Sequence, residues 1–152
     1  MTNRKTIFYA EDNQDFRRML MRWLDSRFSE YDVETFVDGS SLEKRLVGNL
    51  ENVALVIADS DMPIVGADVV KGVGGRIIEK YARKEEFRRV PFVLLYGGHE
   101  AIGKKALEDG AFAYLDKLDP IEKIMMTLNY ALNPDSKDWL PSSLGEILTS
   151  SA

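Results

Sequence analysis

The most constraining feature of the sequence is an unbroken apolar run over residues 53–58, Val-Ala-Leu-Val-Ile-Ala, which ends directly at Asp59. Such a run is typical of a parallel strand covered on both faces, because a strand with one face in water alternates apolar and polar residues. Shorter runs rich in β-branched and aromatic residues predict four further strands, over residues 6–10, 31–36, 92–96 and 112–116.

Segments with helical spacing of apolar residues separate these strands. In the first of them, intervals of three and four residues recur at Phe16, Met19, Leu20, Trp23 and Leu24. In total the sequence predicts five helices, over residues 14–28, 41–50, 67–86, 99–109 and 120–132. Strands and helices that alternate through short loops predict an α/β fold, with a doubly wound, five-stranded parallel sheet of order 2-1-3-4-5 flanked by the helices.

Three helices carry local signals that predict a kink or an end. The third contains Gly-Val-Gly-Gly over residues 72–75, and each glycine costs ~1 kcal/mol in a helix interior, so we expect a break or kink there. Gly110 is expected to close the fourth helix. Asp119 is expected to cap the last helix, with Pro120 as its first residue.

The composition narrows the classes of function. The chain has 152 residues, with 20 basic and 25 acidic side chains and a net charge of −5, and its length predicts one domain. Without cysteine and with a single histidine, a disulfide framework, a cysteine-based zinc site and a serine–histidine–aspartate triad are not expected. The mild acidity argues against a nucleic-acid partner, and the charged stretch 79–89 is interpreted as a solvated helix face.

The sequence predicts neither membrane insertion nor export. No apolar run approaches the ~18–20 residues of a membrane-spanning helix. The apolar run that precedes Glu11 is too short for a signal-peptide core of ~7–15 residues. We therefore expect a cytoplasmic protein with no membrane contact.

Acidic side chains follow two strands that are neighbours in the predicted order. Glu11 and Asp12 follow the first strand, Asp59 and Asp61 follow the third, and Lys117 follows the fifth. Because ligands of such sheets bind at the carboxyl ends of the strands, we expect Glu11, Asp12 and Asp59 to converge. A single acidic residue in such a loop is more often a helix cap than a metal ligand. Three together repel one another and need a cation, and an all-oxygen site favours Mg²⁺.

The same residues suggest a type of chemistry. The carboxylates and one backbone carbonyl leave coordination places for a phosphoryl oxygen, and Lys117 is a mobile charge that suits phosphate. This predicts phosphoryl transfer to a carboxylate, where positioning and charge neutralisation do most of the catalysis. Residues 59–61 also match the Asp-x-Asp of haloacid-dehalogenase-type phosphatases, but those place the motif after the first strand, so a phosphatase is the weaker interpretation.

Over residues 5–132 the chain resembles the receiver domains of two-component response regulators, which have a flavodoxin-like fold. Three pieces carry the resemblance: Ile-Phe-Tyr-Ala-Glu-Asp-Asn over residues 7–13, Leu-Val-Ile-Ala-Asp-Ser-Asp-Met-Pro over 55–63, and Gly-Ala-Phe-Ala-Tyr-Leu-Asp-Lys over 110–117. The middle piece is the most discriminating, because an apolar strand, an aspartate, two residues and Met-Pro rarely occur together elsewhere.

The resemblance implies a role for each candidate residue. Asp59 would be the phosphoacceptor and Lys117 the lysine that contacts the phosphoryl group. Glu11 and Asp12 would be the acidic pair that binds Mg²⁺ or Mn²⁺ together with Asp59. The backbone carbonyl of Asp61 would be the third protein ligand.

One aromatic position matches the family pattern, and three other features depart from it. Tyr114 falls on the aromatic position whose side chain switches between outward and inward rotamers in the family. Tyr96, however, occupies the position of the Ser or Thr whose short hydroxyl bonds a phosphoryl oxygen, and Leu118 replaces the usual proline. Pro63 and Pro91 are 28 positions apart, which is longer than usual, and we place the extra residues around the glycine-rich stretch and the charged run.

Two functions therefore remain open. The first is a phosphoacceptor receiver, phosphorylated by a histidine kinase or histidine phosphotransfer protein, that signals through contacts with a downstream protein and has no enzymatic output. The second is a pseudo-receiver, an interaction module that works without phosphorylation. Tyr96 and Leu118 favour the second function. The first is favoured by the intact acidic residues and lysine, namely Glu11, Asp12, Asp59 and Lys117.

The last helix and the tail over residues 133–152 predict an interaction surface. A core stripe of the last helix needs few apolar residues, so Met125, Tyr130 and Leu132 are expected to face outward. We expect a homodimer through residues 101–132 to cover them. The alternative cover is a short tail helix, capped by the Ser-x-x-Glu of residues 143–146.

Overall fold

The computed structural model describes residues 4–134, so the predicted tail helix lies outside the described residues. Its main sheet has five strands in the order β2-β1-β3-β6-β7, and every neighbouring pair is parallel. The strands of this sheet are β1 (Thr6–Ala10), β2 (Asp32–Phe36), β3 (Val53–Asp59), β6 (Phe92–Tyr96) and β7 (Ala113–Asp116). Since these are the five predicted strands in chain order, the predicted doubly wound sheet and its order are confirmed.

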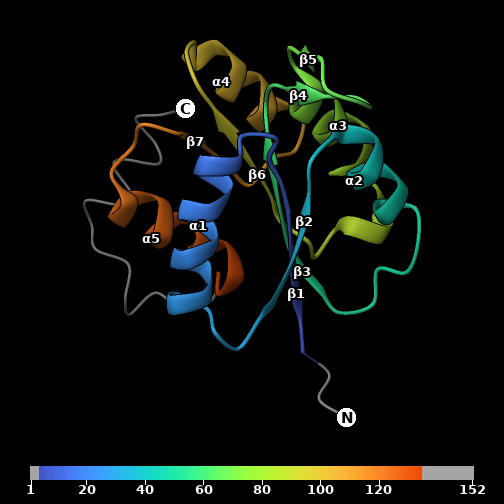
Figure 1. Cartoon of the computed structure of the whole chain (residues 1–152). Helices are drawn as coiled ribbons and strands as arrows, with labels where there is room; N and C mark the ends of the chain where they lie inside the picture. The colour runs from blue at the N-terminus through green and yellow to red at the C-terminus, as the bar shows by residue number, and fades with distance from the viewer. Residues whose placement is uncertain (1–3, 135–152) are drawn as a thin grey trace.

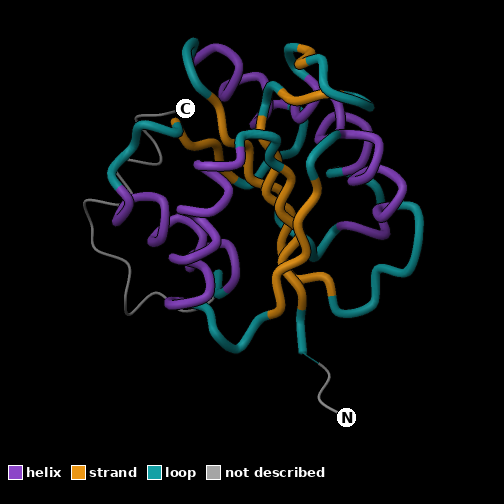
Figure 2. Tube along the Cα trace, in the orientation of Figure 1, coloured by secondary structure: helices purple, strands orange, loops and turns teal. Residues whose placement is uncertain are grey.

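Five α-helices cover the sheet in two layers (Figures 1 and 2). On one face lie α1 and α5, and on the other lie α2, α3 and α4. The helices are α1 (Gln14–Arg27), α2 (Gly39–Leu46), α3 (Val73–Tyr81), α4 (Glu100–Glu108) and α5 (Ile121–Leu132), with a short 3-10 helix η1 (Glu85–Phe87) after α3. No helix in the described region has both the length and the apolar character needed to cross a membrane.

Side-chain caps fix where the first two helices begin, directly after strand ends. Asn13 caps α1, because its Oδ1 accepts a hydrogen bond from the Phe16 amide at 2.9 Å. Asp38 caps α2 in the same way, through the Ser41 amide at 2.7 Å. Since Asn13 rather than Asp12 caps α1, the Asp12 carboxylate has no capping role in this helix.

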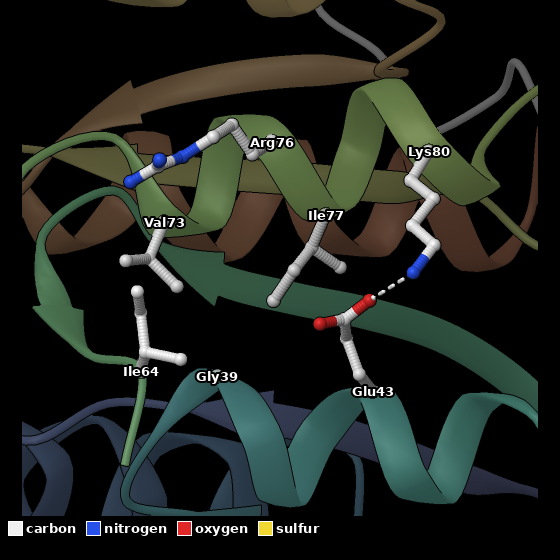
Figure 3. A pocket seen from close by; sticks show the side chains of 7 residues that line it. All are labelled: Gly39, Glu43, Ile64, Val73, Arg76, Ile77 and Lys80. Carbon is white, nitrogen blue, oxygen red and sulfur yellow. Dashed lines mark hydrogen bonds and ion pairs between the residues drawn. The ribbon is translucent and has the colours of Figure 1, made fainter.

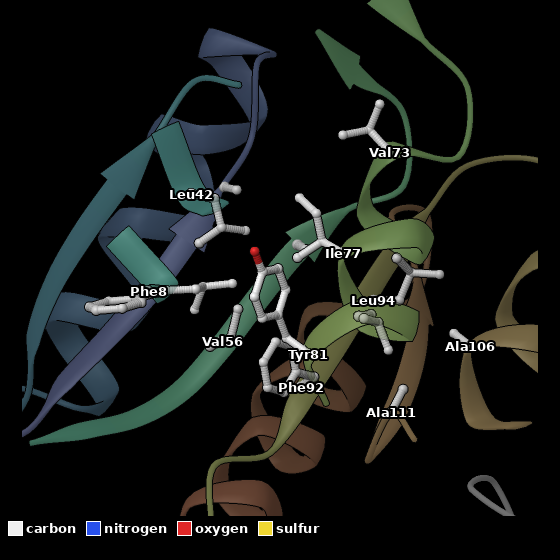
Figure 4. Packing of buried hydrophobic residues seen from close by; sticks show 14 of the residues in the cluster. Phe8, Leu42, Val56, Val73, Ile77, Tyr81, Phe92, Leu94, Ala106 and Ala111 are labelled. Carbon is white, nitrogen blue, oxygen red and sulfur yellow. The ribbon is translucent and has the colours of Figure 1, made fainter. Parts of the chain in front are cut away.

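Each face of the sheet has its own hydrophobic core. One core packs the sheet against α2, α3 and α4, and Figure 4 shows Tyr81 and Ile77 of α3 lying over Val56 and Leu94 of the sheet. The other packs Tyr9, Leu55 and Leu95 against α1 and α5. Because β1, β3 and β6 are covered on both faces, nearly all of their residues are apolar, with Thr6 and Asp59 as the exceptions.

The prediction of a helix starting at residue 67 is wrong. A small antiparallel hairpin, β4 (Met62–Pro63) with β5 (Val69–Val70), occupies this part of the chain. Helix α3 begins only at Val73, and it ends at Tyr81 rather than at 86. The glycine-rich stretch therefore forms the start of a helix rather than a kink inside one, and the hairpin takes up part of the extra length between Pro63 and Pro91.

Gly74 explains why the start of α3 needs glycine. A Cβ at this position would lie 2.2 Å from the Asp59 carbonyl oxygen, which is far inside contact distance. The Gly74 amide also donates a hydrogen bond to the Ser60 carbonyl at 3.0 Å. The first turn of α3 thus rests directly on the backbone of Asp59, which fixes the end of β3.

Two expectations about α5 are also wrong. Asp119 does not cap the helix; its Oδ2 accepts from the Asp116 amide at 2.9 Å and closes the turn after β7, while Pro120 is the residue at the cap. Met125 does not face outward but is buried with only 2% exposure. It is buried because α5 packs against α1 as well as the sheet, so its apolar stripe is wider than a sheet alone requires.

Candidate functional site

The predicted convergence of carboxylates is present at the carboxyl edge of the sheet. Ligand oxygens of Glu11, Asp12 and Asp59 all lie within 4.8 Å of one another. Glu11 and Asp59 are buried, with 0% and 3% exposure, whereas Asp12 is half-buried. A single cation fits this set, because carboxylate oxygens are the ligands that Mg²⁺ prefers and the buried charges need a counterion.

Lys117 joins the two buried carboxylates. Its Nζ donates to Glu11 Oε2 at 2.9 Å and to Asp59 Oδ2 at 3.1 Å, and its stem passes the ring of Phe16, with Nζ 5.0 Å from the ring centroid. The predicted meeting of the lysine after β7 with the acids after β1 and β3 is therefore observed. One ammonium faces two buried carboxylates, which leaves the site with an excess of negative charge.

The excess of negative charge shifts the pKa values of the groups in the site. Burial, and then the neighbouring Glu11 carboxylate, raise the pKa of Asp59 to about 9, while Lys117 acts in the opposite direction. Burial tends to lower the pKa of Lys117, but its contacts with Glu11 and Asp59 outweigh burial and raise it. Without a cation the aspartate thus tends toward its neutral form, and a cation would favour its charged form.

The loop after β3 is tied to the start of α3 through the side chain of Asp61. Its Oδ1 accepts from the Gly72 amide at 3.0 Å and from Ser60 Oγ at 3.2 Å. The Asp61 amide itself donates to Asp59 Oδ1 at 3.4 Å. The carboxylate of Asp61 is therefore used inside the loop.

Further residues, which were not predicted from the sequence, hold Glu11 in place. Arg17 Nη1 donates to the Glu11 carbonyl at 2.8 Å, and the Asn13 amide donates to Glu11 Oε2 at 3.2 Å. Tyr9, fully buried two residues before Glu11, also lies beside this carboxylate. The one available signal was the spacing of Arg17 on the first turn of α1, which brings its side chain back over the preceding loop.

Tyr96 and Tyr114 lie side by side at the ends of β6 and β7. Both are buried, with their ring centroids 5.7 Å apart. The Tyr114 ring lies against Gly103 of α4, where a Cβ would be only 2.0 Å from Cδ2 of the ring, and its hydroxyl donates to Glu100 at 3.4 Å. Burial, followed by the nearby Asp116, raises the pKa of Tyr96 to about 12. In this structure Tyr114 therefore occupies an inward position that depends on glycine at 103.

A separate pocket of about 220 Å³ lies between α2 and α3 (Figure 3). Across it, Lys80 Nζ donates to Glu43 Oε1 at 3.0 Å, and Tyr81 donates to the same oxygen at 2.9 Å. Its walls include Ile64 of the hairpin and Ile77 of α3. The charges of Lys80 and Glu43 are paired with each other. The pocket therefore lies at the contact between α2 and α3, apart from the acidic cluster.

Among the comparisons with known proteins, the solved structures show the fold. No protein-family model and no curated protein matches the sequence. Many solved structures match, among them a response regulator receiver domain protein from Clostridium thermocellum (20% identity, 86% of this chain and 95% of that one, TM-score 0.69). Two others are the beryllofluoride-activated NtrC4 receiver domain dimer (20%, 86% and 98%, 0.68) and the phosphorylated cyanobacterial phytochrome response regulator RcpA (20%, 87% and 96%, 0.67). These matches confirm the resemblance seen in the motifs: the chain has the fold of a response regulator receiver domain.

Proposed function

We propose that this chain is a receiver domain that accepts a phosphoryl group on Asp59, in a reaction that requires Mg²⁺ or Mn²⁺. The observation that carries the proposal is the buried Asp59 carboxylate, held 3.1 Å from the Lys117 ammonium and beside the acidic pair Glu11 and Asp12. One matching structure is a phosphorylated response regulator and another is a beryllofluoride-activated receiver domain, which supports the same chemistry here.

The residues suggest how the transfer proceeds. A carboxylate oxygen of Asp59 attacks the phosphorus, the bond from phosphorus to the donor breaks, and its electron pair leaves with the donor. Lys117 neutralises charge on the phosphoryl group, since its ammonium already reaches Asp59. The phosphoryl group ends on the chain's own side chain, so the domain acts as a signalling module rather than as an enzyme with a separate substrate.

The donor set fits a hard divalent cation. Glu11, Asp12 and Asp59 supply three carboxylates, and the Asp61 carbonyl is the proposed fourth group. A bound Mg²⁺ would neutralise these carboxylates and the incoming phosphoryl oxygens. The half-buried Asp12 is the acid through which the cluster meets solvent.

The phosphodonor in this proposal is a histidine kinase or a histidine phosphotransfer protein. The rim of the site carries exposed apolar side chains that a protein donor would contact, including Leu118 at 92% exposure and Val65 at 72%. Signal output would pass through contacts with a further protein. A pseudo-receiver is the second candidate, and the observation that favours it is the bulky Tyr96 buried against Tyr114.

One experiment separates the two functions. The full chain is incubated with acetyl phosphate and Mg²⁺, and its intact mass is measured with and without a chelator. We expect the addition of one phosphoryl group, lost in Asp59→Asn and retained in Asp25→Asn, an exposed control on α1. Labelling that survives Asp59→Asn or the chelator contradicts the proposed site, and no labelling of the wild type supports the pseudo-receiver.

A further inference from the structure

Tyr9 places a buried hydroxyl directly beneath the acidic site. It lies in β1, two residues before Glu11, so both side chains project toward the same face of the sheet. Tyr9 is 0% exposed. Burial raises the pKa of its hydroxyl far above the ordinary value, and the carboxylates of Glu11 and then Asp59 add to this effect. Tyr9 thus carries a buried hydroxyl in the core, on the face of the sheet toward which Glu11 projects.

Two buried polar atoms in this neighbourhood are complementary. Among the buried side-chain oxygens and nitrogens of residues 4–134, Tyr9 Oη and Glu11 Oε1 accept or donate no hydrogen bond. The Lys117 ammonium lies 2.8 Å from Oε1 as an ion pair, while its hydrogen bond goes to Oε2. A buried polar group without a hydrogen bond destabilises the folded chain. A phenol donates and a carboxylate accepts, so each atom supplies what the other lacks.

The rest of Glu11 is already restrained. Its carbonyl is held by Arg17, and its Oε2 is held by Lys117 and by the Asn13 amide. Its Oε1 lies near the Lys117 ammonium but accepts no hydrogen bond, so it can still take a donor. A glutamate has one more rotatable bond than an aspartate, so a fixed carboxylate requires more restraint.

We propose that Tyr9 is a positioning residue that donates a hydrogen bond to Glu11 Oε1 and so orients this carboxylate toward the divalent cation. The inference rests on the proposed function, because it matters only if the acidic cluster binds metal. Partners of this kind, which contact a metal ligand and not the metal, commonly alter affinity by 10–100-fold when removed.

The test measures Mn²⁺ binding by the electron paramagnetic resonance signal of the free ion. The variant Tyr9→Phe removes one oxygen and keeps the ring in its core. Its matched control is Tyr81→Phe, which removes another buried tyrosine hydroxyl that donates to a glutamate, Glu43, away from the site. We expect Tyr9→Phe to weaken Mn²⁺ binding by about tenfold and Tyr81→Phe to leave it unchanged.

A double-mutant cycle with Glu11→Asp separates positioning from packing. The shorter side chain draws its carboxylate away from the hydroxyl, so Tyr9→Phe is expected to cause no further loss in that background. An unchanged affinity in Tyr9→Phe, or an equal loss in both backgrounds, overturns the inference while leaving the proposed function intact. A wild-type chain that binds no Mn²⁺ overturns the metal-dependent function, and the inference with it.

Discussion

Asp59 shows how a single residue links the proposed function to stability. Its pKa is about 9 in the folded chain, compared with an ordinary value of 3.8, because it is buried next to Glu11. For an acid whose pKa rises on folding, the folded state binds more protons than the unfolded state between these two values. The free energy of unfolding therefore decreases as the pH rises from about 4 to about 9. The aspartate that is suited to accept a phosphoryl group is thus a local source of instability.

Because the pKa of Asp59 is raised on folding, we predict that Asp59→Asn stabilises the chain when no divalent cation is present. The gain in the free energy of unfolding should be on the order of 1 kcal/mol or more near pH 8 and should shrink toward pH ~4. Urea unfolding in a chelator, with Asp25→Asn as the control, measures it. Saturating Mg²⁺ should reduce the gain, because the proposed site has three carboxylates in the wild type and two in the variant, so the cation stabilises the wild type more. A variant less stable than wild type at every pH would contradict this account.

The charged residues of the site were predictable from sequence, but their neighbours were not. Glu11, Asp59 and Lys117 each follow an apolar strand directly, and parallel strands end at one edge of the sheet. Neither Tyr9 nor Arg17 stands out in this way. Tyr9 looks like one more apolar residue of a buried strand. The spacing of two residues places Tyr9 and Glu11 on the same face of the sheet, but it does not show that the Tyr9 hydroxyl reaches the Glu11 carboxylate.

At the level of elements, the sequence predicted the five strands of the main sheet and missed the hairpin. The strands were predictable because their apolar runs are bounded by turn residues. The strands β4 and β5 have only two residues each, too few to show an alternating pattern, and Val69 and Val70 also suit helical spacing. The start of α3 was placed too early because Gly74 serves a contact with β3 that lies fifteen residues earlier in the chain.

The packing of β6, β7 and α4 leads to a prediction about the response to phosphorylation. Tyr96 fills the space beside Tyr114, which in turn lies on Gly103, so the position of Tyr114 depends little on a ligand at Asp59. Tyr96→Thr supplies a short hydroxyl and empties this space, at a cost of about 2–4 kcal/mol in stability. We expect it to enlarge the response to beryllofluoride, measured as amide chemical-shift changes over residues 97–118.

Tyr96→Phe is the matched control for that experiment. It keeps the ring and removes only the hydroxyl, so its response should equal that of the wild type. If the wild type already gives a full response and Tyr96→Thr adds nothing, Tyr96 does not limit the coupling between Asp59 and α4.

At the scale of the whole molecule, the exposed apolar side chains gather mainly at one end. Ile64, Val65 and Val69 of the hairpin and Leu118 after β7 are exposed around the carboxyl edge of the sheet. The sequence had placed such a patch on α5, but Met125 is buried there. The surface of α5 is therefore less apolar than expected, while the rim of the acidic site is more apolar.

The predicted homodimer through residues 101–132 accordingly needs a different variant to test it. Met126 is the better position, because its side chain is half-buried, whereas a charge at Met125 would disrupt the core. We expect sedimentation to give a dimer mass for the full chain and for a truncation after Asn133, and a monomer mass for Met126→Glu. Val47→Glu, a change at a 70% exposed valine beyond α2, should leave the dimer intact.

If Val65→Asp separates the subunits and Met126→Glu does not, the chain pairs through the hairpin instead. A monomer in every sample, with lower stability after truncation, would show that the tail covers α5.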